Sequence, residues 1–268
     1  MLGAYHRIGR YDAAVASGID HLVIAVNDPD AAAAELTEAI GLAFTAGGRH
    51  PGLGTFNRIA FLGDAYLELM GVDDPAAAVG WTIGAAALRA LERGGGFANY
   101  GLVDDAIRNT VARLQANGSG IGSVIHGSRE RPDGEQVEWW TASPPELGPD
   151  EPPFLIKHVA AGAEWGVAAL AARRGFVHPV GAPMRLLGIE LGVADPLHLA
   201  ARCAQQVGLE FSAIGELGQD GAVAAIGPQT IAMTPSASSR LRVMLGVLGN
   251  TAGQSATIGG VDYVLRAA

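Results

Sequence analysis

Two residues of opposite acid–base character, His21 and Glu68, lie within strongly apolar segments of the sequence, IDHLVIAVN and AYLELMGV. An imidazole nitrogen and a carboxylate oxygen together suit a divalent ion such as Zn, Fe, Mn, Ni or Co. A metal ion with open positions can bind two adjacent substrate oxygens, polarise a carbonyl and stabilise an enolate. The alternative is structural: His21 is then a hydrogen-bonded core residue, and strand alternation turns Glu68 toward solvent.

A glycine-rich loop, GRHPGLGTFN, holds two further candidates, His50 and Asn57. Glycines let the backbone approach a ligand closely, and binding residues concentrate on loops held by rigid elements. His50 is predicted to be a catalytic acid–base group, a third metal ligand or a hydrogen-bond donor to the substrate. Asn57 is predicted to orient the substrate through a hydrogen bond. The alternative for His50 is that the His-Pro pair only shapes the loop.

Arginine and tryptophan side chains form a third group of candidates. Arg129 and Arg131 flank a predicted turn at 131–134 and are suited to hold a carboxylate or phosphate group bidentately. The alternative is that at least one of them is a solvated strand residue. Trp139 and Trp140 alternate along a predicted strand, so one of them faces inward. Trp140 is taken as the substrate-contacting residue, with plain core packing as the alternative.

The elements that position these residues follow the order β-α-β-β-β. The first apolar segment is predicted to be a buried strand that stops at Asp28-Pro29, followed by a helix over residues 30–40 that ends at Gly41. The segment LAFTA then begins a second strand. RIAFLG and AYLELMGV form two more, joined by a tight turn at Gly63-Asp64. The predicted first unit spans residues 18–75.

The same landmarks recur in the C-terminal part of the chain. The segment LGIELGVA again stops at an Asp-Pro pair, Asp195-Pro196, and a predicted helix again ends at a glycine, Gly208. Both landmarks are displaced from the first unit by the same number of residues, and GLEFSAIG matches GLAFTAGG. Repeats of this size indicate duplicated supersecondary units that need a partner to bury their sheet face.

A third copy lies between these two, with a strand at 97–105 and an amphipathic helix at 106–118. The sequence therefore predicts an α+β fold built from repeated βαβββ units, with mixed and antiparallel sheets and flanking helices. The predicted parts are an N-terminal extension (1–17), a domain of two units (18–178, with units at 18–75 and 96–160) and a degenerate second domain of one unit plus a truncated unit (184–268).

The stretches GIDHLVIAVNDPDAAAAEL, GGRHPGLGTFNRIAFLGDAYLELMGV, SRERPDGEQVEWW, PPFLI and LLGIELGVADP resemble the glyoxalase-like domain family. That family lies in the vicinal oxygen chelate (glyoxalase/bleomycin resistance/dioxygenase) superfamily. The resemblance covers most of the chain from about residue 18. It implies that βαβββ units pair into incomplete barrels around a central cavity, with metal ligands on the first and last strands of each unit. His21 and Glu68 occupy those two positions in the first unit.

The same resemblance is weaker in the later units. When the second unit is aligned with the first, Phe97 or Ala98 takes the position of His21, and neither side chain binds a metal. On the last strand of that unit His158 is the usual ligand type, and it is the predicted third metal ligand. In the third unit small residues replace both ligands, which indicates a role in structure or assembly.

Composition argues against several classes of function. The chain of 268 residues carries a formal net charge of -9, which disfavours non-specific binding to nucleic acid. No uncharged apolar run is long enough to span a membrane, and no secretory segment follows Arg7 and Arg10. The single cysteine, Cys203, excludes an intramolecular disulfide and favours a reducing, cytoplasmic setting.

The resemblance implies a metal-dependent enzyme acting on a small oxygenated organic substrate. Isomerase or lyase chemistry through an enediolate-like intermediate is expected, with His50 and Glu68 as the catalytic residues. A homodimer is compatible with the resemblance. Two alternatives remain: a metal-free protein that binds and sequesters a small molecule, and a ring-cleaving dioxygenase, which usually needs two histidines and one carboxylate.

Overall fold

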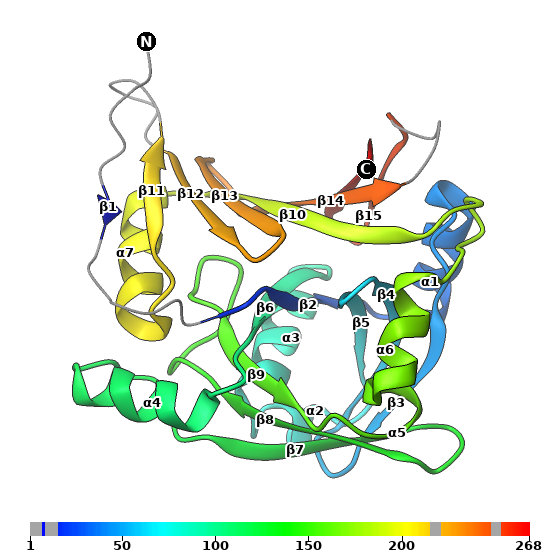
Figure 1. Cartoon of the computed structure of the whole chain (residues 1–268), viewed down its shortest axis with the longest axis horizontal. Helices are drawn as coiled ribbons and strands as arrows, with labels where there is room; N and C mark the ends of the chain where they lie inside the picture. Colours follow the sequence, from blue (N-terminus) through cyan, green and yellow to red (C-terminus); the bar gives the residue numbers. More distant parts are fainter. Residues whose placement is uncertain (1–6, 9–15, 215–220, 248–252) are drawn as a thin grey trace.

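The computed structural model describes residues 7–8, 16–214, 221–247 and 253–268. Two sheets form the molecule: a barrel, and an open sheet of eight strands that lies across it (Figure 1). Most of the predicted N-terminal extension lies outside the described residues. Within the described ranges, no helix is both long and apolar enough to cross a membrane.

The first βαβββ unit begins where sequence reasoning places it. Its elements are β2 (Ile19–Ala25), α1 (Pro29–Ile40), β3 (Thr45–His50), β4 (Thr55–Leu62) and β5 (Ala65–Val72). Asp28 caps α1 by accepting hydrogen bonds from the backbone N–H groups of Asp30 and Ala31. Gly41 ends the helix in the left-handed region at φ 66°, a conformation that favours glycine.

The second unit closes the first into a barrel. Its elements are β6 (Gly96–Val103), α4 (Ile107–Ala116), β7 (Ile125–Glu130), β8 (Gln136–Ala142) and β9 (Phe154–His158). The strand order is β2-β5-β4-β3-β7-β8-β9-β6, and the sheet is closed, where the resemblance implied an incomplete barrel. The closure between β3 and β7 rests on the single pair Arg49 and Glu130.

The third unit and the tail build the open sheet. Its elements are β10 (Met184–Val193), α7 (Pro196–Val207), β11 (Phe211–Ile214), β12 (Gly221–Ile226), β13 (Gln229–Pro235), β14 (Arg240–Val247), β15 (Ser255–Ile258) and β16 (Val261–Ala267), with the short β1 (Arg7–Ile8) at one edge. Asp195 caps α7 and Gly208 ends it at φ 69°, so α7 has the same kind of N-cap and C-cap residues as α1. The division of the chain into two domains near residues 178–184 stays a prediction.

Side-chain alternation decides which residues of β2 and β5 face the barrel interior. Leu22 and Leu67 belong to the core that joins the barrel to the open sheet, together with residues such as Ile189. Because β-strand side chains alternate, the intervening residues, among them His21 and Glu68, point into the barrel. The requirement for an apolar face between the two sheets therefore turns both polar residues inward.

Two pairs of helices that were not predicted from the sequence accompany the barrel. They are α2 (Pro75–Ala78), α3 (Thr82–Glu92), α5 (Gly162–Trp165) and α6 (Val167–Arg174). Ile83 and Ala87 of α3 pack against Val23 and Met70 inside the barrel. Helix α3 therefore fills part of the barrel and leaves a small pocket beside it.

The segment between the two sheets contains a buried neutral histidine, His178, which is 2% exposed. Its Nδ1 accepts from the backbone N–H of Ala43 at 3.1 Å, and its Nε2 donates to the carbonyl of Phe61 at 3.0 Å. Only a neutral imidazole can make both hydrogen bonds. Burial lowers the pKa of His178 below 6.5, although the bond to Phe61 opposes that shift.

Acidification is therefore expected to destabilise the fold through His178. His178 binds a proton at a higher pH in the unfolded chain than in the folded chain. The contribution of neutral His178 to the free energy of unfolding is therefore present above about pH 6.5 and is lost as the pH falls below that value. The free energy of unfolding should fall by up to about 1.4 kcal/mol per pH unit for this group. Urea denaturation between about pH 7 and pH 5 measures it.

The matched variants are His178→Gln and His198→Gln, because His198 is exposed on α7. The first should flatten the dependence of stability on pH, and the second should leave it as in the wild type. Equal pH dependence in all three proteins would show that His178 does not carry the effect.

Candidate active site

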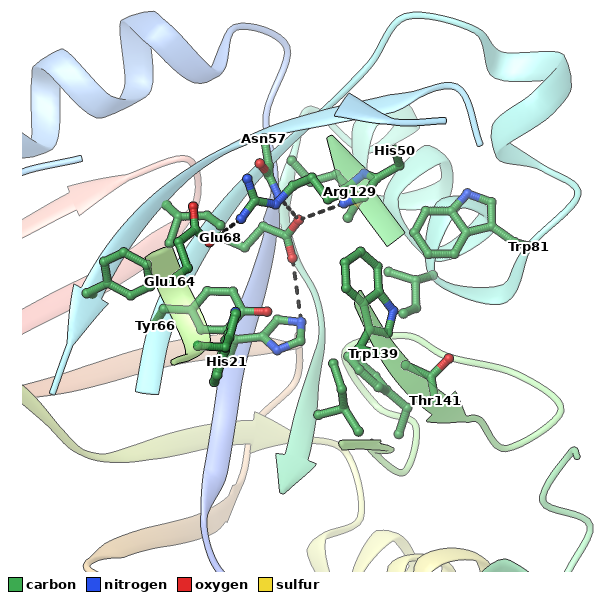
Figure 2. A pocket seen from close by; sticks show the side chains of 17 residues that line it. His21, His50, Asn57, Tyr66, Glu68, Trp81, Arg129, Trp139, Thr141 and Glu164 are labelled. Atoms are coloured by element: carbon green, nitrogen blue, oxygen red, sulfur yellow. Dashed lines mark hydrogen bonds and ion pairs between the residues drawn. The ribbon is translucent and has the colours of Figure 1, made fainter. Parts of the chain in front are cut away.

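A pocket inside the barrel is built around His21 on β2 and Glu68 on β5. These strands are parallel neighbours, with His21 opposite Tyr66 and Val23 opposite Glu68. His21 and Glu68 are each 4% exposed, and the Nε2 atom of His21 lies 3.5 Å from Oε2 of Glu68 (Figure 2). The Tyr66 ring stacks on the imidazole, with 4.4 Å between ring centroids, and so holds its plane.

Asp20 fixes the other side of the His21 ring. Its Oδ1 atom accepts from Nδ1 of His21 at 2.6 Å and from Nε2 of His158 at 3.1 Å. Burial alone raises the pKa of Asp20, but the charges and hydrogen bonds of His158 and His21 outweigh it, and the pKa falls well below the usual range. An ionised Asp20 keeps the proton of His21 on Nδ1 and leaves the lone pair of Nε2 facing Glu68.

His50, at the end of β3, approaches Glu68 from the opposite side (Figure 2). Its Nδ1 atom lies 2.7 Å from Oγ1 of Thr55, and its Nε2 atom lies 3.8 Å from Oε1 of Glu68. Burial lowers the pKa of His50, partly offset by the nearby charge of Glu68. Asn57 donates from Nδ2 to the same Oε1 atom at 2.7 Å, so the Glu68 carboxylate lies between two imidazoles and an amide.

The other residues predicted from the sequence divide into two that line the pocket and two that do not. Arg129 and Trp139 line the pocket. Arg131 is not among its lining residues and forms an ion pair with Asp133. Trp140 is also outside the pocket and stacks against the guanidinium of Arg108. Of the two adjacent tryptophans, the structure therefore brings Trp139 to the site.

The sequence of residues 19–207 matches a family model described as a glyoxalase-like domain. That match covers more than half of the chain. The chain belongs to the glyoxalase-like domain family. The family places this protein in the vicinal oxygen chelate superfamily, in agreement with its repeated βαβββ units.

Two solved structures with TM-scores above 0.5 agree with this family fold. A hypothetical protein from Staphylococcus aureus has a TM-score of 0.75 at 15% identity, over 93% of this chain and 99% of that one. A mutant 4-hydroxymandelate synthase from Streptomyces coelicolor has a TM-score of 0.52 at 15% identity, over 88% and 72%. Methylmalonyl-CoA epimerase from Mycobacterium tuberculosis has a TM-score of 0.39 at 17% identity, over 55% and 91%. No curated protein matches, and identities this low show the fold alone.

The donor groups of this glyoxalase-like protein fit a metal ion in part. His21 and Glu68 direct lone pairs at each other across 3.5 Å, an arrangement that a cation between them would stabilise. Asp20 bonds the outer nitrogen of His21, as carboxylates do behind metal-ligating histidines. Among the described residues, however, no group of three or more His, Cys, Asp or Glu side chains is arranged to hold a metal ion.

His158 does not complete a ligand set with this pair. Its Nε2 atom is engaged by Asp20, and it is not among the residues that line the pocket. Its ring stacks on Trp165, with 3.4 Å between centroids. The structure therefore gives His158 a place behind the pocket wall, where it supports Asp20.

Several pocket residues of the glyoxalase-like protein were not singled out from the sequence. The lining also includes Tyr66, Trp81, Phe154, Glu164 and Trp165. Trp81 and Trp165 belong to connecting segments that carry no repeat pattern, so no alignment between units points to them. An aromatic lining of this kind favours a small, partly apolar ligand.

Gly47 holds β3 in the shape that places His50 in the site. Its φ is 64°, and a Cβ atom there would lie 1.9 Å from the carbonyl oxygen of Asn57. Gly52 has a similar φ of 71° but open space around it. Gly47→Ala is expected to lose at least about 1 kcal/mol more stability than Gly52→Ala, because both are strained and the first also clashes. Urea denaturation of the two variants measures the difference, and equal losses would contradict this account of β3.

Proposed function

We propose that this glyoxalase-like protein is an enzyme that transfers a proton on a small oxygenated organic molecule, as an isomerase or a lyase. One observation carries the proposal: a buried carboxylate, Glu68, lies between the imidazoles of His21 and His50 at a pocket inside the barrel. Acid–base groups gathered in a buried pocket are the usual components of proton-transfer sites.

In this proposal His50 moves the proton. Its burial favours the neutral imidazole, which is the form that can accept a proton at neutral pH. Glu68 stabilises the imidazolium that forms, since its Oε1 atom is 3.8 Å from Nε2 of His50. Asn57 holds that carboxylate through its hydrogen bond, and the aromatic lining excludes water from the reacting atoms.

We further propose that His21 and Glu68 hold a divalent ion, with Zn, Fe, Mn, Ni and Co as the suitable metals. Such an ion would supply Lewis-acid polarisation of a substrate carbonyl. Asp20 orients His21 for this role through the 2.6 Å hydrogen bond. The aligned Nε2 and Oε2 atoms support the pair as ligands, and the bond of His158 to Asp20 argues against His158 as a third.

A metal-free protein that binds and sequesters a small molecule is the second candidate. The observation that favours it is Ala98, which packs within the barrel interior on β6 with Val23 and Phe154. The first strand of the second unit therefore carries no His, Cys, Asp or Glu side chain. A ring-cleaving dioxygenase is less well supported, since it usually needs two histidines and a carboxylate around one open centre, and no such three-ligand group is found in the described ranges.

The setting proposed for this activity is the cytoplasm. The single cysteine, Cys203, is fully buried, and burial raises the pKa of its thiol, which suits a reducing compartment. A homodimer and the absence of nucleic-acid partners are proposed from the family resemblance and from the net charge of -9.

Exchange of carbon-bound hydrogen for deuterium tests the proposed reaction class. A panel of candidate compounds takes the place of a single substrate. The protein is incubated in D2O with small α-hydroxy and α-keto carbonyl compounds, and loss of C–H signals is followed by NMR. Protein-dependent exchange in at least one compound is the expected result. Binding of a panel member without exchange would instead favour the sequestering protein.

A further inference from the structure

We propose that Arg129 and Arg131 form a carboxylate-binding subsite, which Glu164 fills while the pocket is closed. The ligand of the pocket is then a small carboxylic acid, whose carboxylate displaces Glu164 on binding. This inference deepens the proposed function by naming a substrate class, and it rests on that function only in treating the ligand as a substrate.

The contacts of Glu164 carry the proposal. The Glu164 side chain is 7% exposed and gives one carboxylate oxygen to each arginine: Oε2 to Nη2 of Arg129, and Oε1 to Nη1 of Arg131 at 2.7 Å. Arg129 is 3% exposed, lines the pocket and donates from Nη1 to the carbonyl of Gly47 at 2.8 Å. Two guanidinium groups that hold one internal carboxylate are equally suited to hold the carboxylate of a ligand.

The element that carries Glu164 is a helix of four residues with glycines at its ends. Helix α5 begins at Gly162, at φ 74°, and Gly166 follows its last residue; these glycines supply conformational freedom at both ends. The apolar contacts of α5 and α6 centre on Trp165, which clusters with Ile59, Tyr66 and Val137, and on Leu170, which packs against that cluster. The other buried residues of the two helices, Glu164 and Arg173, are charged, so outward movement of the segment requires Trp165 to leave this cluster.

The pocket must enlarge to admit such a ligand. The free volume is about 30 Å³, while sites for small molecules typically measure roughly 300–1,000 Å³. Glu164 and Trp165 both line the pocket, so outward movement of α5 enlarges the space and frees Arg129 in one step. The entering carboxylate then replaces the contacts that Glu164 gives up.

Arg173 supplies independent support for a closed state that is poised to open. Its guanidinium lies over the rings of Phe61 and Trp165, 4.6 and 4.3 Å from their centroids. The Nε, Nη1 and Nη2 atoms are buried without a hydrogen-bond partner. Unmet buried donors of a charged group are costly, so movement of this segment toward solvent recovers their hydration.

Binding of benzoate, compared with the neutral benzamide, tests the exchange of carboxylates. The affinity of each compound is measured by calorimetry for the wild type, Glu164→Gln and the exposed control Glu38→Gln. Glu164→Gln should bind benzoate at least about tenfold more tightly than the wild type, because the subsite no longer holds a competing charge. Benzamide should also gain from the easier opening of the pocket, but benzoate should remain the tighter ligand of Glu164→Gln, and the control should match the wild type.

A second variant keeps the test decisive if loss of the Glu164 charge disturbs folding. Arg129→Met/Glu164→Met removes both buried charges together, a replacement that proteins tolerate well, and it should bind benzoate no better than benzamide. Unchanged benzoate affinity in Glu164→Gln, or benzamide bound by that variant as tightly as benzoate, would overturn the subsite. Because no turnover is measured, either result leaves the C–H exchange assay to judge the proposed function separately.

Discussion

Replacing His50 with glutamine is expected to slow C–H exchange by about 100- to 10,000-fold, the usual contribution of a positioned general base. Glutamine retains a polar group but cannot take up a proton at neutral pH. The imidazole is buried, its Nδ1 atom lies 2.7 Å from Oγ1 of Thr55, and its Nε2 atom faces Glu68. These contacts leave Nε2 as the nitrogen available to a substrate.

The metal content of His50→Gln separates its proposed role from that of a ligand. Elemental analysis should find as much metal as in the wild type, while the exchange rate falls. His198→Gln, at an exposed position on α7, is the control and should exchange at the wild-type rate. Normal exchange in His50→Gln would remove this histidine from the mechanism, and loss of metal would make it a ligand.

Replacing Asp20 with asparagine is expected to weaken metal binding by about 10- to 100-fold, the usual cost of losing a carboxylate behind a ligating histidine. Asp20 is 2% exposed and accepts hydrogen bonds from both His21 and His158. An amide carries no charge and also presents an N–H donor, so it no longer holds the proton of His21 on Nδ1. The His21 tautomer that has its proton on Nδ1 and the lone pair of Nε2 toward Glu68 is then less strongly favoured.

A Co²⁺ titration followed by visible absorption measures this effect in Asp20→Asn. Asp105→Asn, at an exposed position, should bind Co²⁺ as the wild type does. Urea denaturation of the same proteins shows whether a loss of affinity comes from unfolding. Unchanged Co²⁺ affinity in a folded Asp20→Asn protein would show that Asp20 supports the core and does not position His21.

Much of the fold could be predicted from local signals in the sequence. The Asp-Pro pairs at 28–29 and 195–196 begin helices at the same place in two units, and Gly41 and Gly208 end those helices. Each of these signals acts within a few residues, so the chain displays it directly. Helices α3, α5 and α6 were missed because their faces are defined by the barrel and by each other, and they have no counterpart in the repeat.

Some residues of the candidate site could likewise be placed from local signals in the sequence, and others could not. His21, Asn57 and Glu68 could be placed because a strand with one required apolar face turns its other residues into the barrel. Asp20 could not be placed in this way, because strand alternation points its side chain away from that of His21. In the structure the register of β2 against β6 shifts between Ile19 and His21, and the carboxylate of Asp20 reaches the imidazole of its neighbour.

The roles of the arginines depend on contacts that the sequence does not display. Arg129 and Arg131 were expected to bind an anion, and the anion found there is Glu164, a residue about thirty positions away with no motif around it. Trp139 and Trp140 could not be distinguished, because a shift of one residue in register exchanges the two faces of a strand.

Elemental analysis of protein purified without added metal, beside a His21→Ala variant, tests the central claim most directly. The claim is that His21 and Glu68 form the ligand pair of a metal-dependent site. A near-stoichiometric divalent metal in the wild type, lost in the folded variant, is the predicted result. Absence of metal from both proteins, or equal metal in both, would contradict it.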